Sequence, residues 1–198
     1  MSNENVTVVI TEEGELYYTG YKASFEKSNS KLEKYHKKLP KGEIKYIEIG
    51  GDAIIAVMDD GKIYFEGKDN EYNFNSFNEE KLTFKCKERP DTEEEEIIDI
   101  TVGKNFHMYI TDKGKLYGAG SAILLPFEAA NNDASYVKIE LPEGIIPKKV
   151  VGSCSDESQQ SVILLVDNQG KSELWSGGKS IFGLLGQGEE IIDSNEFK

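Results

Sequence analysis

Hydrophobic and polar positions follow a pattern that occurs four times along this chain. In each copy an apolar run leads into a short polar segment with a glycine, and a Leu or Ile beside an aromatic residue then precedes a second glycine. Alternation with a period of two is typical of β-strands, and a glycine in a short polar loop favours a hairpin. The copies predict β-hairpins near residues 8–20, 54–67, 108–120 and 162–177, with turns at Gly14, Gly61, Gly114 and Gly170.

A further strand is predicted upstream of the hairpin in the second, third and fourth copies. Alternating apolar positions end in glycine at 47–51, 100–103 and 150–153, whereas the first copy lacks this element. The turn glycines stand about 50 residues apart, a spacing typical of propeller blades rather than helical solenoids. The sequence therefore predicts an all-β, β-propeller-type chain, with residues 1–198 forming one domain of about three and a half repeats.

Two segments resemble the repeats of a known family. The segment 102–107 contains Gly103 and, four residues later, His107. A glycine-rich tail at 182–188 follows the segment Leu174-Trp175-Ser176-Gly177. In these features the chain resembles the regulator of chromosome condensation repeat family over roughly residues 6–190. The resemblance implies a β-propeller. No copy is complete, since Ile54 and Asp156 stand where the third copy has His107.

Closure of the propeller is the main question that the resemblance raises. Members of the family are seven-bladed, so three and a half repeats would form an arc with open sheet edges, which pair readily with other strands. The chain is then part of a longer one, or completes a ring with a second chain, or closes as a small four-bladed propeller. The glycine-rich segment 183–188 favours the first two, because it preserves the family's connection between blades.

One basic segment stands out in an otherwise acidic chain. Apolar residues at 25, 32, 35 and 39 have roughly helical spacing, with six lysines among the residues from 25 to 42. One interpretation is a contact site for an acidic partner or phosphate, with Lys31, Lys34, Lys37 and Lys38 as the candidate partner-binding residues. The other is a solvated helix or long loop between two blades.

The charge of the chain and the spacing of its cysteines argue against nucleic-acid binding and against zinc or disulfide-exchange sites. The chain has 36 acidic and 23 basic residues and a net charge of −13, which disfavours binding to nucleic acid. Cys86 and Cys154 do not form a close-spaced pair of the kind that binds zinc or exchanges disulfides, so we expect reduced, buried thiols. The Glu93–Glu96 run is expected to be a surface loop, because adjacent carboxylates point in different directions.

The sequence predicts no catalytic, cofactor-binding or metal-binding residues. His36 and His107 are the only histidines, and His107 falls on the family's structural histidine position. No phosphate-binding glycine loop, nucleophile elbow or metal-binding histidine pair is found. A further class of function is an enzyme that uses a propeller as its scaffold.

The resemblance implies a non-enzymatic protein-interaction module or scaffold. Its alternative is guanine-nucleotide exchange on a small GTPase, which works by protein contact and needs no acid or base. No apolar run approaches the roughly 20 residues that cross a bilayer, and residues 1–5 lack the features of a secretory signal. We therefore expect a soluble protein of the cytoplasm or nucleus, with no membrane contact.

Overall fold

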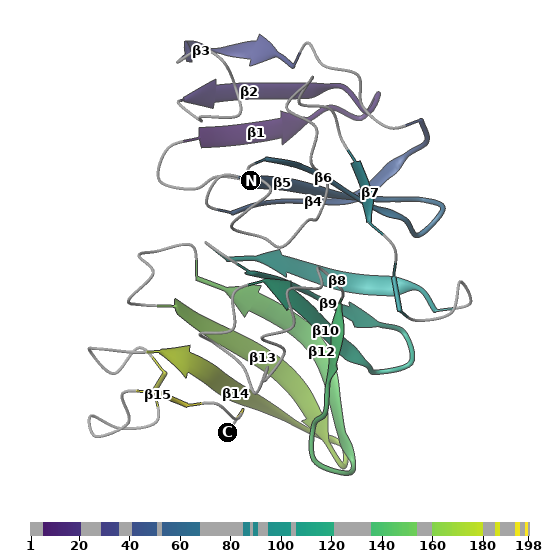
Figure 1. Cartoon of the computed structure of the whole chain (residues 1–198), viewed down its shortest axis with the longest axis vertical. Coiled ribbons are helices and arrows are strands. Elements are labelled where there is room, and N and C mark those ends of the chain that lie inside the picture. Colours follow the sequence, from purple (N-terminus) through teal and green to yellow (C-terminus); the bar gives the residue numbers. More distant parts are fainter. Residues whose placement is uncertain are drawn as a thin grey trace.

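The chain folds into four small antiparallel β-sheets that follow one another in sequence order (Figure 1). The computed structural model describes residues 6–20, 29–35, 41–50, 53–67, 85–87, 89–90, 95–103, 106–120, 136–153, 160–179, 185–186, 193–194 and 197. Every regular element in these residues is a strand. The all-β fold predicted from the repeats is confirmed.

Each sheet is a meander whose consecutive strands are hydrogen-bonded neighbours. The described strands of blade 1 are β1 (Val6–Ile10), β2 (Leu16–Gly20) and β3 (Asn29–Lys34). Blade 2 contains β4 (Ile44–Gly50), β5 (Ala53–Met58), β6 (Ile63–Gly67) and β7 (Lys85–Lys87). Blade 3 contains β8 (Ile97–Val102), β9 (Phe106–Thr111), β10 (Leu116–Gly120) and β11 (Val137–Ile139). Blade 4 contains β12 (Ile145–Gly152), β13 (Gln160–Asn168), β14 (Lys171–Lys179) and β15 (Asp193–Ser194).

The hairpins β1–β2, β5–β6, β9–β10 and β13–β14 turn at the four glycines that the repeats single out. Gly14, Gly61, Gly114 and Gly170 have φ angles of 77°, 78°, 70° and 85°, which glycine adopts without steric cost. In the β9–β10 hairpin, the Gly114 N–H donates to the Thr111 carbonyl at 2.9 Å, and the same closure occurs in the first two hairpins. This is a three-residue loop that ends in a left-handed glycine.

The upstream strands β4, β8 and β12 begin blades 2, 3 and 4 and lie next to one another, β4 against β8 and β8 against β12. We call them the inner strands. Their approach is close enough to require glycine. A Cβ on Gly50 would lie 2.2 Å from the Gly103 carbonyl oxygen of blade 3, and a Cβ on Gly152 of blade 4 would lie 2.9 Å from the Phe106 ring of blade 3. These glycines therefore let the ends of neighbouring blades pack together.

Three hydrophobic cores lie between successive blades, because each sheet presents an apolar face on both sides. Side chains of blades 1 and 2 share one core, those of blades 2 and 3 a second, and those of blades 3 and 4 a third. Strand β9 contributes to two of them, with Tyr109 facing blade 2 and Met108 facing blade 4. All six of its residues are buried.

The four blades form an open arc. Blade 1 lies at one end of the long axis and blade 4 at the other (Figure 1). The small closed four-bladed ring considered from the sequence is therefore wrong. The physical reason is that, among the described residues, each of the three hydrophobic cores lies between blades that are neighbours in chain order.

The helical interpretation of residues 25–42 is also wrong where the structure describes that segment. Residues 29–34 form β3, the third strand of blade 1, which pairs antiparallel with β2. The Tyr35 N–H donates to the Leu16 carbonyl at 2.7 Å, and the Tyr35 ring meets Tyr18 edge-on at 6.0 Å. Pairing with β2 and burial of Tyr35 therefore outweigh the local helical spacing.

Candidate protein-binding site

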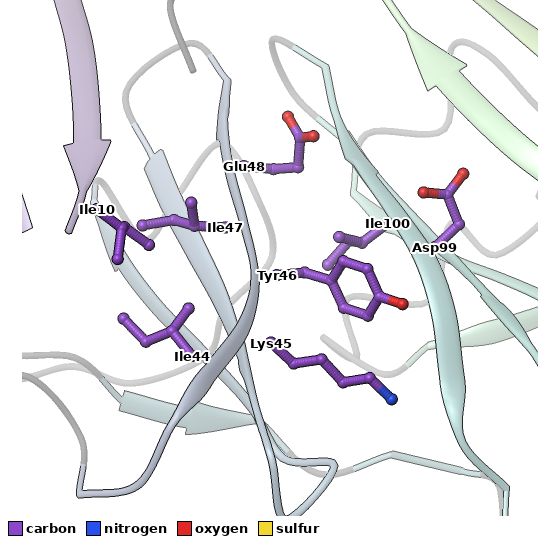
Figure 2. A pocket seen from close by; sticks show the side chains of 8 residues that line it. All are labelled: Ile10, Ile44, Lys45, Tyr46, Ile47, Glu48, Asp99 and Ile100. Atoms are coloured by element: carbon purple, nitrogen blue, oxygen red, sulfur yellow. The ribbon is translucent and has the colours of Figure 1, made fainter. Parts of the chain in front are cut away.

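A pocket of about 370 Å³ opens beside the inner strands where blades 2 and 3 meet. We call it the inner cleft. Figure 2 shows Lys45, Tyr46 and Glu48 pointing from β4 toward β8, which carries Asp99. The lining residues are Ile10, Ile44, Lys45, Tyr46, Ile47, Glu48, Asp99 and Ile100.

A β-bulge sets the direction of the side chains on β4. Ile44 pairs with Met58 and Tyr46 pairs with Val57, so Lys45 is an extra residue in the strand. Bulges re-aim side chains and increase the local twist. Beyond the bulge the ordinary alternation resumes, with Ile47 packed in the core against blade 1 and Glu48 on the opposite face. The same register shift occurs near the start of β8 and β12.

Glu48 and Asp99 give the inner cleft an acidic character. Burial, followed by the negative charge of Asp99, raises the pKa of Glu48 from 4.5 to about 6. Burial also raises the pKa of Asp99, although its Oδ2 accepts a hydrogen bond from the Val150 N–H at 2.8 Å, which acts in the opposite direction. Both carboxylates are thus partly desolvated, but Figure 2 shows that they lie on opposite sides of β8: Glu48 points into the gap between blades 2 and 3, and Asp99 is turned toward β12 of blade 4.

The one basic residue of the cleft is engaged elsewhere. Lys45 Nζ forms an ion pair with Glu96, which lies just before β8 and does not line the pocket. The same ammonium group lies 5.7 Å from the centre of the Tyr46 ring. Lys45 therefore links blades 2 and 3 at the rim and leaves Glu48 as the carboxylate that points into the pocket, beside apolar walls.

This arrangement suits a basic side chain better than a metal ion. Calcium takes six to eight oxygen ligands, and the described residues contain no group of three or more His, Cys, Asp and Glu that could hold a metal. Lysine and arginine side chains bury their aliphatic stems on apolar surface while the charged end reaches an acid. Ile44 and Tyr46 offer such a surface beside Glu48.

The lysines predicted as partner-binding residues lie elsewhere in the fold. Lys31 and Lys34 are exposed on β3, the outermost strand of blade 1, whereas Lys37 and Lys38 lie outside the described residues. Lys34 forms an ion pair with Glu15, which lowers the pKa of Glu15. The structure therefore brings Lys31 and Lys34 onto one strand, at the edge opposite the inner strands.

His107 is fully buried on β9 and meets the Tyr136 ring edge-on at 4.9 Å. It occupies a packing position in the core. His36 and Cys154 lie outside the described residues, as does the side chain of Cys86 on β7.

Sequence reasoning did not identify the two acids of the inner cleft. The sequence does contain a signal, because Glu48 and Asp99 are charged residues that each stand between two isoleucines of a predicted strand. A charged residue within a mostly buried strand requires a partner or access to solvent. Which of these applies depends on the neighbouring blade, and the sequence does not show how the blades stack.

Comparison with known proteins reveals the architecture. No protein-family model and no curated protein sequence matches the chain. Human WBSCR16 superposes with a TM-score of 0.79 at 18% identity, over 100% of this chain and 51% of that one. Prp20p from Saccharomyces cerevisiae superposes with a TM-score of 0.71 at 16% identity, over 99% of this chain and 48% of that one. This is the fold of half an RCC1-type β-propeller.

Yeast RCC1 (Prp20), in its complex with Kap60, superposes with a TM-score of 0.69 at 17% identity. The match covers 98% of this chain and 46% of the yeast protein. The chain thus spans about half the length of the RCC1-type propellers that it matches. The propeller implied by the family resemblance is confirmed at the level of the fold. The described residues include no helix that could cross a membrane.

Proposed function

We propose that this chain is a non-enzymatic protein-binding module, and that its inner cleft accepts a basic side chain of the partner. The observation that carries the proposal is Glu48, which points from β4 toward β8 among the lining residues of the cleft and is partly desolvated there. A cation that enters the cleft would favour the charged form of Glu48, whose pKa would fall from about 6. Binding would thus relieve the unfavourable burial of this carboxylate.

The proteins with the same fold support a protein partner. Yeast RCC1 (Prp20) was crystallised with Kap60 bound, and the Prp20p structure was described with its binding properties to Gsp1p and histones. The partner proposed for this chain is a protein with an exposed lysine or arginine. A second chain that pairs with this one is a further protein partner, and the proposed compartment is the cytoplasm or the nucleus.

Guanine-nucleotide exchange on a small GTPase is the alternative function. It is supported by the likeness to Prp20p, whose binding to Gsp1p is described with its structure. A nucleotide-release assay with a panel of small GTPases tests it directly. If the chain accelerates nucleotide release and Glu48→Gln abolishes that acceleration, the inner cleft is part of an exchange surface. If nucleotide release is accelerated from none of the GTPases, the protein-binding module stands as the proposed function.

The experiment that tests the proposed function compares two substitutions of the same chemistry. Wild-type chain, Glu48→Gln and Glu43→Gln are immobilised, and the proteins that they retain from native extract are identified by mass spectrometry. Glu43 is exposed just before β4 and does not line the cleft, so it is the matched control. We expect partners that Glu43→Gln retains and Glu48→Gln loses. The same set of proteins on all three would contradict a role for the cleft.

A further inference from the structure

The outer face of blade 4, which points away from blade 3, exposes three large apolar side chains, while Ser176 on the same face is buried and donates to the Leu185 carbonyl. Val151 on β12, Ile163 on β13 and Leu174 on β14 are 61%, 41% and 72% exposed. Val151 pairs with Ile163, and Leu174 pairs with Leu165, so these side chains form a continuous patch across three strands. A large apolar patch on a sheet face marks an interaction surface.

The corresponding positions of blades 2 and 3 show what kind of surface this patch is. Ile163, Leu165 and Leu174 occupy the positions that Met108, Ile110 and Leu116 occupy in blade 3, since Ile110 pairs with Leu116 as Leu165 pairs with Leu174. All three blade 3 residues are buried in the core against blade 4. The corresponding residues of blade 2, Ile55, Val57 and Ile63, are buried against blade 3. The exposed patch therefore has the composition of a blade-to-blade interface.

The opposite end of the arc has a complementary face. On β1 and β2, Val8 and Leu16 pack into the core against blade 2, while Val9 and its cross-strand partner Tyr17 lie on the other face. Val9 is 42% exposed. Val9 occupies the position of Tyr109 in blade 3, which packs in the core against the preceding blade. The outer face of blade 1 is thus the kind that receives a preceding blade.

The two end faces also match in their hydrogen-bonding groups. On blade 3, Asp99 and Thr101 accept the N–H groups of Val150 and Gly152 from the next inner strand. The corresponding residues of blade 4 are Lys149 and Val151, whose side chains offer no acceptor. Blade 4 therefore suits a neighbour that has no inner strand, because these two positions carry no side-chain acceptor for the N–H groups of such a strand. The described strands of blade 1, which are β1, β2 and β3, correspond to β5, β6 and β7 of blade 2 rather than to an inner strand.

We propose that a second copy of this chain docks head to tail, with the outer face of its blade 1 on the outer face of blade 4. The contact is heterologous, and two such contacts related by a two-fold axis close a ring. Two copies are the expected number, because one copy spans 51%, 48% and 46% of the RCC1-type propellers that it matches. The closed ring would have about eight blades, within the range of four to eight that is typical of propellers. This inference does not depend on the proposed role of the inner cleft.

The mass of the 198-residue chain in solution tests the proposal. By sedimentation velocity from 1 to 100 µM, we expect a species of twice 22.2 kDa. Leu174→Asp and Val9→Asp each place a charge on one of the two end faces and should convert the dimer to monomer at the same concentrations. Lys138→Asp, on the exposed outermost strand of blade 3, is the control and should stay dimeric.

Circular dichroism of each variant separates loss of docking from loss of fold, and a monomer that keeps the wild-type β-sheet spectrum supports the proposal. A wild-type chain that stays monomeric throughout the range overturns it, and would assign the patch to blades of another polypeptide. A dimer that both end-face substitutions leave intact also overturns it. So does an open ladder of oligomers without a dimer plateau, because the contact would then not close.

Discussion

The carboxylate of Asp99 accepts the backbone N–H of Val150 at 2.8 Å and so ties the inner strand of blade 3 to that of blade 4. Thr101 Oγ1 accepts the Gly152 N–H at 2.7 Å two residues further along. No sheet pairing joins β8 and β12, which belong to different sheets. Side chains therefore supply the hydrogen bonds between blades that backbone ladders supply within them.

Replacing Asp99 by alanine should lower the free energy of unfolding by about 1.5–3 kcal/mol, because it removes a charged acceptor and leaves the Val150 N–H without it. Asp99→Asn keeps a carbonyl oxygen at the same position and should lower the free energy of unfolding by less than Asp99→Ala does. Urea denaturation at pH 7 measures both. Equal losses for the two substitutions would show that the hydrogen bond contributes little.

Glu48→Gln should stabilise the chain at pH 7.5. Since the folded pKa of Glu48 is about 6, above its ordinary 4.5, the folded state holds this proton more tightly than the unfolded state. The stability from Glu48 is fully present below pH 4.5 and is lost as the pH rises through 6. The glutamine variant avoids that loss, so its advantage should be about 1 kcal/mol, discounted for partial exposure.

Urea denaturation of wild type and Glu48→Gln between pH 4 and 8 measures this difference. The two should be equally stable near pH 4 and should diverge between pH 4.5 and 6.5. Comparing the variants at each pH removes the contribution of the other carboxylates. A constant offset across the range would contradict the assignment to Glu48.

Gly114→Val should cost more stability than Gly14→Val. Both glycines have positive φ, which costs a valine about 1–3 kcal/mol. At Gly114 an added Cβ would also lie 2.9 Å from Ile146 Cγ2, whereas at Gly14 it would meet nothing within 4 Å. Thermal unfolding ranks the two variants. The reverse order would mean that Ile146 moves aside without cost.

Arg89 is expected to stabilise the junction of blades 2 and 3. Its guanidinium group donates to the Gly61 carbonyl at 3.0 Å and to the Glu95 carbonyl at 2.7 Å, and it lies 5.5 Å from the centre of the Tyr109 ring. Arg89→Met should reduce the free energy of unfolding by about 1–3 kcal/mol. Arg89→Lys should restore little of it, because an ammonium group cannot match both carbonyls. Chemical denaturation of both variants provides the measurement.

The parts of the fold that depend on local sequence could be predicted, and those that depend on stacking could not. The turn at Gly114 follows from a polar loop between alternating strands, which the sequence displays directly. The inner cleft has lining residues from β4 and β8, such as Glu48 and Ile100, which are brought together only when blades 2 and 3 stack. Residues 29–34 became a strand rather than a helix because β2 offered an open edge, and no local pattern encodes that edge.

Strand β9 is buried on both faces, and this has a consequence for the order in which the chain opens. In the monomeric chain, where blades 1 and 4 are not docked, each blade is stabilised mainly by its immediate neighbours, so opening begins at the ends and moves inward. Blade 3, flanked on both sides, should exchange its amide hydrogens most slowly, and blade 1 should exchange much faster. The β9 ladder would then serve as the last cooperative unit to open, and its formation would limit the rate of refolding.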